Sequence, residues 1–308
     1  MTLPATPRNV IILALALSLL LGLVVLASLT MGAVHLPLAA VFSALTSRAA
    51  GSEAATIVLG IRLPRILLAI LVGAALAVAG TGLQALLRNP LADPYVLGIS
   101  SGAAVGAIFA LWVGGRVASA SPLAAFVGAM ITMIWVYLLG RSGGRLASYT
   151  LILAGVITAS FLSAIILFML TLLSTRDVRG IAFWLMGDLS VTPLAELRIL
   201  APVVILAIAA LYLLSKDLNV LLLGAEEAAH LGVNVARVEV GVYVLASLLT
   251  GLAVSTSGAI GYLGLLVPHL GRMLVGNDHR LLLPTAALGG AILLVLSDTL
   301  ARTAVAPA

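Results

Sequence analysis

A serine and a histidine are the residues of this chain whose types could do covalent chemistry. Ser142 lies in the segment 140–144, GRSGG, which matches the G-x-S-x-G surroundings of hydrolase serines. His269 is the candidate general base, so the pair would make an intramembrane serine protease. However, Arg141 and Arg145 flank the serine at the end of an apolar run, and this pattern is typical of a short interfacial turn. We therefore favour a turn at Ser142 and keep proteolysis as an alternative.

Two patterns associated with nucleotide binding lack the sequence context that nucleotide binding requires. Residues 80–85 read GTGLQA and fit the dinucleotide pattern G-x-G-x-x-A, but they lie inside an apolar run, and Ser100 stands where an acidic residue is needed. A P-loop ends in Lys and Ser or Thr after a glycine-rich turn, whereas the single lysine, Lys216, is followed by Asp217. The sequence therefore predicts that the chain is not an enzyme and binds no cofactor. If ATP and Mg²⁺ drive its work, a partner subunit hydrolyses the ATP.

Metal binding is not expected either. The chain has no cysteine, and no second histidine or carboxylate is spaced to complete a metal site with His269. A hydrogen bond near a helix break is the expected role of this histidine. Asp298 is costly to bury in an apolar run, and we expect it to pair with Arg302 one helical turn further on.

The composition indicates that these residues lie in a membrane protein. Of the 308 residues, 62% are apolar and 9% are charged, with a mean hydropathy of +1.25. Soluble domains carry about 25% charged residues, so a soluble enzyme is excluded. A membrane-spanning helix needs about 20 mostly apolar residues. Nine runs approach this length: 10–29, 66–87, 96–113, 122–140, 150–173, 199–214, 238–255, 259–275 and 281–300. The prediction is an all-α, polytopic membrane protein with one domain over residues 1–308.

The connections between the apolar runs are short. Segments 34–47 and 178–190 are amphipathic and are expected to lie in one interface, and segment 216–237 is the longest charged connection. Within it, residues 224–232, GAEEAAHLG, predict a short helix with an acidic first turn and a glycine end. We expect this helix to lie flat at the cytoplasmic surface; a solvated loop helix is the alternative. Its apolar side, facing a partner or the bilayer, is made of leucines: Leu221, Leu222, Leu223 and Leu231.

The distribution of charged residues does not indicate a partner, whereas the glycine pattern indicates close helix packing. The net charge is +5, but the basic residues are scattered singly, so nucleic acid is not an expected partner. With the N-terminus in the cytoplasm, eight Lys and Arg residues fall on each side of the membrane, so the positive-inside rule does not orient the chain. Gly98, Gly102 and Gly106 form two GxxxG steps, and Gly73 with Ala77 repeats the pattern. We expect these steps to pack helices within the chain rather than to form a dimer face.

Several long, ordered motifs between residues 57 and 304 carry a family resemblance. They are RLPR (62–65), VGAALAVAGTGLQALLRNPLADPYVLGISSGAAVGA (72–107), LLLGAEEAAHLGVN (221–234), SGAIGYLGLLVPHLGRMLVGNDHRLLLP (257–284) and SDTLAR (297–302). Together they resemble the permeases of type II ABC importers, the FecCD-type subunits that carry iron chelates, haem or vitamin B12. The motifs are specific for the family and do not distinguish a ferric siderophore, haem or cobalamin as cargo.

The resemblance implies an assembly in the bacterial inner (plasma) membrane. Two permease copies, identical or closely related, would stand on a cytoplasmic ABC ATPase dimer, and a periplasmic or lipid-anchored substrate-binding protein would deliver the cargo. The N-terminus would lie in the cytoplasm. Basic residues at the positions of Arg62, Arg65 and Arg302 would face the periplasm and pair with glutamates of the binding protein. A secondary transporter driven by an ion gradient is the alternative, although Asp298 is the only acidic residue near membrane depth.

The resemblance also implies roles at the cytoplasmic side. Asn89, Leu91 and Ser148 match positions that the family uses as a cytoplasmic gate. The family's coupling helix, which docks on the ATPase, falls within the loop 216–237, at Leu223, Gly224, Ala225, Glu226, Glu227, Ala228, Leu231 and Gly232. Family members continue after the SDTLAR-like motif with a tenth helix, whereas this sequence ends at Ala308.

Overall fold

The structure is a computed structural model of the chain and describes residues 4–32, 34–46, 51–114, 120–142, 145–173, 175–190 and 194–304. The elements follow in chain order: α1 (Pro7–Thr30), α2 (Leu38–Leu45), α3 (Glu53–Ala55), η1 (Thr56–Arg62), α4 (Leu63–Leu87), η2 (Pro94–Leu97), α5 (Ile99–Gly114), α6 (Ala120–Leu139), β1 (Arg141–Ser142), β2 (Arg145–Leu146), α7 (Ser148–Thr171), α8 (Thr175–Leu185), α9 (Leu194–Leu213), α10 (Ser215–Leu221), α11 (Ala225–His230), α12 (Val235–Ser257), α13 (Leu263–Val275) and α14 (His279–Ala304).

Nine apolar helices within the described ranges occupy the nine predicted runs. Seven of them, α1, α4, α6, α7, α9, α12 and α14, are long and apolar enough to cross a membrane, and α5 and α13 are shorter apolar helices. Strand structure among the described residues is confined to a two-stranded antiparallel hairpin, β1–β2, in which Arg141 lies opposite Leu146. The predicted all-α, polytopic class is confirmed.

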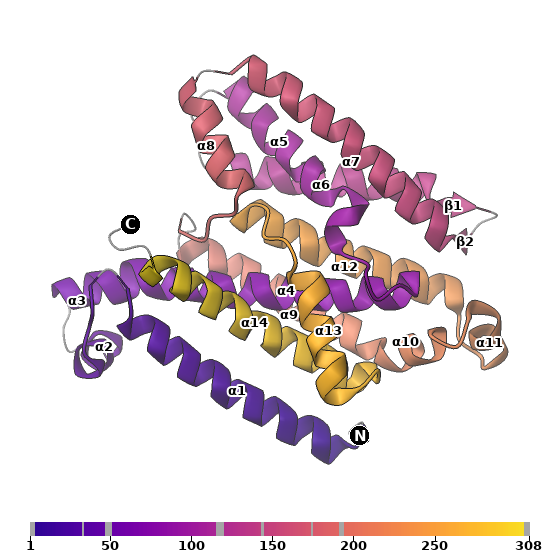
Figure 1. Cartoon of the computed structure of the whole chain (residues 1–308), viewed down its shortest axis with the longest axis horizontal. Helices are drawn as coiled ribbons and strands as arrows, with labels where there is room; N and C mark the ends of the chain where they lie inside the picture. The colour runs from indigo at the N-terminus through magenta and orange to yellow at the C-terminus, as the bar shows by residue number, and fades with distance from the viewer. Residues whose placement is uncertain are drawn as a thin grey trace.

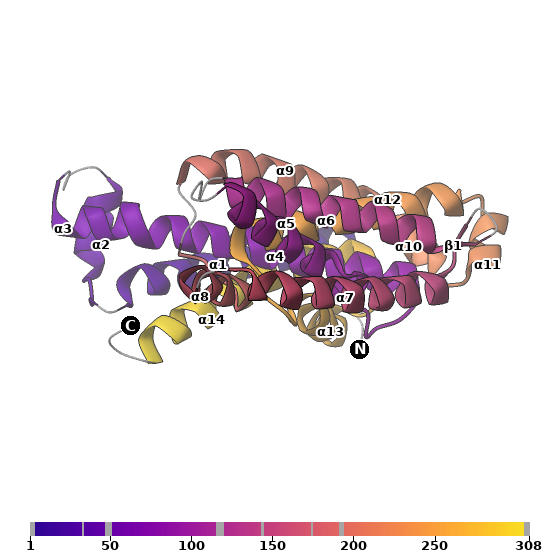
Figure 2. The ribbon, with the colours of Figure 1, turned by 90° about the horizontal axis from the view of Figure 1, so that it is seen from above.

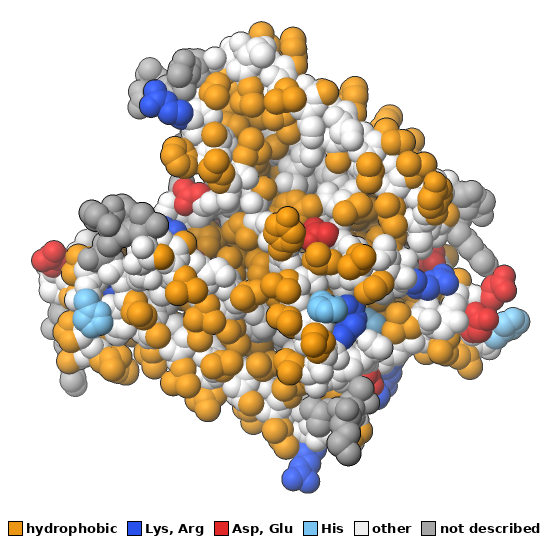
Figure 3. All heavy atoms as spheres, viewed as in Figure 1, with side chains coloured by type: hydrophobic (Ala, Val, Ile, Leu, Met, Phe, Trp, Pro, Cys, Tyr) orange, Lys and Arg blue, Asp and Glu red, His pale blue; other side chains and the backbone are white. Residues whose placement is uncertain are grey.

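Helix α4 is the central element of the bundle. Helices α9, α12, α13 and α14 pack against it, as Figure 1 shows. Every residue from Val72 to Leu87 is buried, so this stretch is covered on all sides, as expected of a central helix with apolar residues all round. Hydrophobic side chains are spread over the whole face of the molecule seen in Figure 3, and charged ones are few.

The central helix is longer than the apolar run predicts. Together with α3 and the π-helical turn η1, α4 forms one helical segment of 35 residues from Glu53 to Leu87. At 1.5 Å per residue this is about 52 Å, against a hydrocarbon thickness of about 30 Å. The extension was missed because Glu53, Arg62 and Arg65 interrupt the apolar pattern. One end of the segment must therefore project beyond the hydrocarbon.

The bundle has two distinct ends along its long axis. Helix α11, the hairpin β1–β2 and the first turn of α1 lie towards one end, which we call the α11 end (Figures 1 and 2). Helices α2, α3 and α8 and the last turn of α14 lie towards the other, which we call the arginine end. The amphipathic segments 34–47 and 178–190 contribute α2 and α8, so their described parts share one end of the bundle, as expected.

Small residues bring α5 and α6 into close contact. A Cβ atom added at Gly128 of α6 would meet the backbone of Gly102 and Gly106 on α5. The predicted GxxxG pattern thus packs helices within the chain. Helices α4 and α14 use the same device, because a Cβ atom added at Gly290 would meet the backbone of Gly73 and the side chain of Ala77.

We expect Gly128→Leu to destabilise the protein by about 1–3 kcal/mol or more, because the obstructing atoms are backbone atoms that cannot rotate away. Thermal unfolding of the purified protein in detergent would measure the effect. Gly22→Leu is the matched control, since Gly22 is an exposed residue of α1 with nothing within 4 Å of an added Cβ atom. Equal stability of the two variants would contradict the packing role of Gly128.

Candidate functional site

A cluster of charged side chains joins α4 and α14 at the arginine end. Asp298 is its centre, with a side chain that is only 5% exposed. Its Oδ1 atom accepts a hydrogen bond from Nε of Arg65 at 2.8 Å and lies 2.7 Å from Nη2 of the same guanidinium in an ion pair. Its Oδ2 atom accepts from Nε of Arg302 at 3.0 Å. The structure contains the predicted pair of Asp298 and Arg302 and adds Arg65 as a second partner.

Helix α1 is tied to the same cluster. Arg302 Nη2 donates to Ser28 Oγ at 3.0 Å, and Thr299 Oγ1 donates to the same atom at 2.7 Å. Arg62 is 5% exposed, and its guanidinium donates to the carbonyl oxygens of Leu29, at 2.6 Å, and of Val34. The charged groups therefore fix the end of α1 against α4 and α14.

The structure brings together the three arginines predicted to dock a binding protein, but it gives them different surroundings. Arg65 and Arg302 have side chains that are 24% and 16% exposed and that surround one carboxylate. The Arg62 guanidinium lies inside and serves the backbone. Three guanidiniums against the one carboxylate of Asp298 leave a net charge of +2 on the cluster. Docking by these residues stays a prediction, and in this conformation it concerns Arg65 and Arg302 more directly than Arg62.

At the opposite end, α11 stands on the surface. It begins after Gly224 and ends before Gly232, which have φ angles of +128° and +87°. Glu226 and Glu227 lie in its exposed first turn, and Ala228 is the residue that it buries. Charged side chains of both signs are seen at this edge of the molecule in Figure 3. The short helix with an acidic first turn is therefore present, as the sequence predicts.

The leucines around α11 divide into two groups. Leu223 and Leu231 are 63% and 64% exposed, and Leu222 is 41% exposed. Leu221, predicted on the same outward apolar side, is completely buried, and that part of the prediction is wrong. The reason is that Leu221 is the last residue of α10, whose inner side packs into the core, and the chain turns outward only after it.

The predicted gate residues also lie towards the α11 end. Arg88 ends α4 in the left-handed region at φ 49°, and Asn89 follows it. The Asn89 Oδ1 atom accepts a hydrogen bond from the backbone N–H of Leu91 at 3.0 Å, and Leu91 is 73% exposed. Ser148 is half-buried at the start of α7, directly after the hairpin. A gating role for the three residues stays a prediction.

The serine and histidine of the protease alternative are not brought together. Ser142 belongs to the hairpin beyond α6, and His269 is an exposed residue of α13. Figures 1 and 2 both show α13 well separated from β1 along the long axis. A nucleophile and its base must lie within hydrogen-bond reach of each other, and the separation of these two elements gives the protease alternative no support.

Sequence reasoning missed a polar cluster inside the α11 half of the bundle. Gln84, on the central helix, is 2% exposed. Its Nε2 atom donates to the carbonyl oxygens of Ala92 at 3.2 Å and Gly264 at 3.1 Å, and its Oε1 atom accepts from Arg272 Nη2 at 2.5 Å. The amide thus joins α4, the loop after it and α13. A glutamine within an otherwise apolar run was the only sequence signal for this junction.

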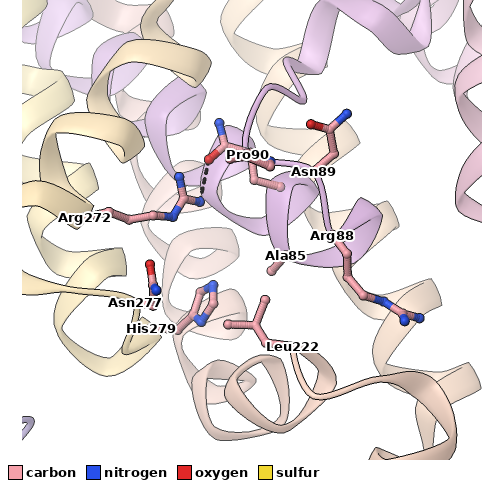
Figure 4. A pocket seen from close by; sticks show the side chains of 9 residues that line it. Ala85, Arg88, Asn89, Pro90, Leu222, Arg272, Asn277 and His279 are labelled. Carbon is pink, nitrogen blue, oxygen red and sulfur yellow. Dashed lines mark hydrogen bonds between the residues drawn. The ribbon is translucent and has the colours of Figure 1, made fainter.

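A cavity of about 270 Å³ adjoins this cluster, and Figure 4 shows the side chains around it. It lies between the last turn of α4 and the loop after it, Leu222 after α10, Arg272 of α13 and the start of α14. Arg272 and His279 approach it from one side, and Ala85 and Leu222 supply apolar wall.

The comparisons with known proteins agree on one family. Residues 19–308 match the FecCD transport family. The chain is 44% identical over 251 residues to the cobalamin import system permease protein BtuC of Halobacterium salinarum, covering 81% of this chain and 68% of that protein. It is 42% identical over 303 residues to the hemin transport system permease protein HmuU of Yersinia pestis, covering 95% and 87%.

A solved structure shares the whole arrangement. It is described as an inward-facing conformation of a metal-chelate type ABC transporter, and it superimposes with a TM-score of 0.84 at 32% sequence identity. The similarity covers 97% of this chain and 92% of that one. The central α4 and the helices around it are therefore a fold that a solved transporter also has.

Proposed function

Because this chain belongs to the FecCD transport family, we propose that it is the transmembrane permease subunit of an ATP-driven importer for an iron chelate, haem or cobalamin. The relatives named for cobalamin and for hemin are 44% and 42% identical to it, so the class of cargo is supported and one member of it is not singled out. We propose the bacterial inner membrane as its location.

The α11 end is the proposed docking surface for a cytoplasmic ABC ATPase dimer. Leu223 and Leu231 offer exposed apolar side chains, and Glu226 and Glu227 offer charge beside them, a combination that suits a protein interface. The permease itself is proposed to hydrolyse no ATP and to hold no cofactor, with ATP and Mg²⁺ bound by the ATPase subunits. The exposed helix α11 is the observation that carries this assignment.

The arginine end is the proposed docking surface for a periplasmic or lipid-anchored substrate-binding protein. The net charge of +2 on the cluster of Arg62, Arg65, Arg302 and Asp298 would attract acidic side chains of that partner. A second permease copy, as a homodimer, would present the same cluster twice and so receive two acidic regions. With a partner bound at each end, a movement at one end of the bundle would be coupled to the other end through α4.

Transport then follows from alternating access. ATP binding closes the ATPase pair, α11 moves with it, and the tightly packed helices rock as blocks between inward-facing and outward-facing states. Glycine contacts such as Gly102 with Gly128 suit this motion, because they hold helices at one fixed spacing. Asn89, Leu91 and Ser148 are the proposed cytoplasmic gate.

Reconstitution tests the proposal. The permease would be co-expressed and co-purified with a candidate P-loop ATPase from the same organism, and placed in liposomes with a candidate substrate-binding protein. We expect uptake of hemin, a ferric siderophore or cobalamin that requires ATP and all three components. Failure of the permease and the ATPase to associate in any nucleotide state would contradict the proposal, as would uptake driven by an ion gradient without the ATPase.

Neutralising Arg65 tests the docking surface at the arginine end. We expect Arg65→Gln to slow association with the binding protein and to reduce its dependence on salt, because exposed interfacial charges act mainly on the rate of encounter. Association rates measured by surface plasmon resonance at several NaCl concentrations would show this. Arg141→Gln removes an exposed charge at the α11 end and is the control. An unchanged rate and salt slope in Arg65→Gln would contradict the assignment.

A further inference from the structure

The cavity beside Gln84 has a wall that is positively charged and carries no carboxylate. Its nine lining residues, all within the described part of the chain, include Arg88, Arg272 and His279 and no aspartate or glutamate. Arg272, which lines the cavity, donates to Gln84. In Figure 4 the side chain of Arg88 extends away from Arg272 and His279. Arg272 and His279 are therefore the polar groups that define what could bind.

Arg272 presents one hydrogen-bond donor without an acceptor. Its Nη2 atom donates to Gln84 Oε1 at 2.5 Å, but its Nη1 atom is buried and has no hydrogen-bond partner among the described residues. A guanidinium is always charged in a protein, and a buried charge without a partner is costly. A hydrogen-bond acceptor would satisfy this nitrogen, and a negatively charged one would do so most strongly.

His279 presents an acceptor without a donor. It is 2% exposed, and its Nδ1 atom lies 2.8 Å from Asn219 Oδ1, which also accepts the backbone N–H of His279 at 2.8 Å. Asn219 Nδ2 donates to Asp278 Oδ1 at 2.8 Å, which assigns the amide oxygen to the histidine side. The proton of the neutral ring is thus on Nδ1, and Nε2 is left as an acceptor. That Nε2 atom is buried with no partner among the described residues.

The neighbouring carboxylate does not compensate for either group. Asp278 accepts hydrogen bonds from Arg280, with Oδ2 at 2.6 Å from Nη2, and from Asn219. These contacts lower the pKa of Asp278 to about 2, so its carboxylate stays ionised and engaged with Arg280. The charged groups around His279 are therefore Arg272 on α13, Arg88 at the end of α4, and the pair of Asp278 and Arg280 beside it.

We propose that the cavity binds a phosphate group that carries a proton, as inorganic phosphate or a phosphate monoester. The deprotonated oxygens of such a group accept from Arg272 Nη1, and its O–H donates to His279 Nε2. The second ionisation of a phosphate monoester has a pKa of about 6, so singly protonated forms are present near neutral pH. A carboxylate has lost its proton at that pH and satisfies Arg272 alone. The chemistry at Arg272 and His279 thus favours phosphate. This inference concerns binding and is independent of the proposed transport function.

The location gives such a ligand a structural consequence. It would join the last turn of α4 to α13 and the start of α14, and Leu222, which lines the cavity, lies two residues before Gly224 at the start of α11. Asn89, a predicted gate residue, also lines it. A bound phosphate would therefore hold the loop after α4 and the approach to α11 in one arrangement.

Binding of radiolabelled inorganic phosphate to the purified chain in nanodiscs tests the inference. In chloride buffer at pH 6.5 we expect saturable binding of one phosphate per chain, with sulfate at least tenfold weaker because it has no proton to donate. We also expect phosphate, but not sulfate, to raise the thermal unfolding temperature of the wild type, a readout that needs no variant. Absence of saturable binding, or equal affinity for sulfate, would overturn the inference.

Two substitutions examine the two contacts separately. Arg272→Gln and His279→Phe are each expected to weaken phosphate binding at least tenfold, since each removes one of the two contacts and a hydrogen bond to a charged group is worth at least that factor. Arg237→Gln removes an exposed arginine at the start of α12 and is expected to bind as the wild type does. If both cavity variants fold, as judged by circular dichroism, and still bind phosphate normally, the inference is wrong.

Nanodisc composition identifies the source of the phosphate. In discs of phosphatidylcholine alone, a free cytosolic phosphate is represented by the added inorganic phosphate. In discs that also contain phosphatidic acid, whose headgroup is a phosphate monoester, a lipid ligand would compete and lower the binding of added phosphate. Unchanged binding assigns the site to a free phosphate, and competition assigns it to a lipid headgroup. Either result supports the phosphate chemistry.

Discussion

The double variant Glu226→Lys, Gly232→Val is expected to lose at least about nine-tenths of ATP-driven transport, a loss of coupling worth about 1.4 kcal/mol or more, while its ATPase partner continues to hydrolyse ATP. Gly232 has a φ of +87°, and a residue with a side chain pays about 1–2 kcal/mol in this region, so the chain leaving α11 must take another path. Reversing the charge of Glu226 changes the exposed first turn of the same helix. Together the substitutions alter both the direction and the surface of α11.

Parallel measurements of ATP hydrolysis and uptake in proteoliposomes would test this. The matched control is Glu196→Lys, the same charge change in the exposed first turn of α9, at the arginine end of the bundle. It is expected to keep the ratio of transport to hydrolysis. If the α11 variant keeps that ratio too, the ATPase docks elsewhere on the permease.

Asp298→Asn is expected to reduce the free energy of unfolding by about 3–5 kcal/mol, because it leaves Arg65 and Arg302 partly buried without a counter-charge. The new amide also turns a donor group towards guanidinium donors. The loss would extend to α1, which the same cluster fixes through Ser28. Chemical denaturation in detergent, followed by tryptophan fluorescence, would measure the change.

Asp278→Asn is the control for this effect. Asp278 also pairs with an arginine, but its side chain and that of Arg280 are 25% and 42% exposed. The pair is more exposed to solvent than the one at Asp298, so we expect this variant to lose clearly less stability than Asp298→Asn. Equal losses in the two variants would show that burial of Asp298 does not determine its contribution.

The sequence predicts the helices well because each membrane-spanning helix requires a long apolar run. All nine runs coincide with apolar helices of the described chain, and the short helix in the segment 216–237 appears where its glycines place it. The GxxxG steps at Gly102 and Gly106 also point to the contact that forms, since small residues have few other uses in a span. Local patterns thus gave the elements and some of their packing.

What escaped prediction depends on residues far apart in the chain. Arg65 and Asp298 are separated by 233 residues, and neither motif indicates that the two side chains form an ion pair. The apolar run begins only after Arg65, whereas the helical segment already begins at Glu53. Leu221 looks like its neighbour Leu222, yet one is buried and the other exposed, because a helix ends between them.

The unbroken course of α4 has a mechanical consequence. From Arg65 to Leu87 it is one α-helix without an internal proline or a π turn, and it begins at the charged cluster and stops beside the loop of Asn89. Twenty-two residues at 1.5 Å each make a lever of about 33 Å, so a tilt of about 5° at the Arg65 end displaces the far end by about 3 Å. A tilt that begins at the arginine end would therefore be carried along one unbroken helix to the loop of Asn89.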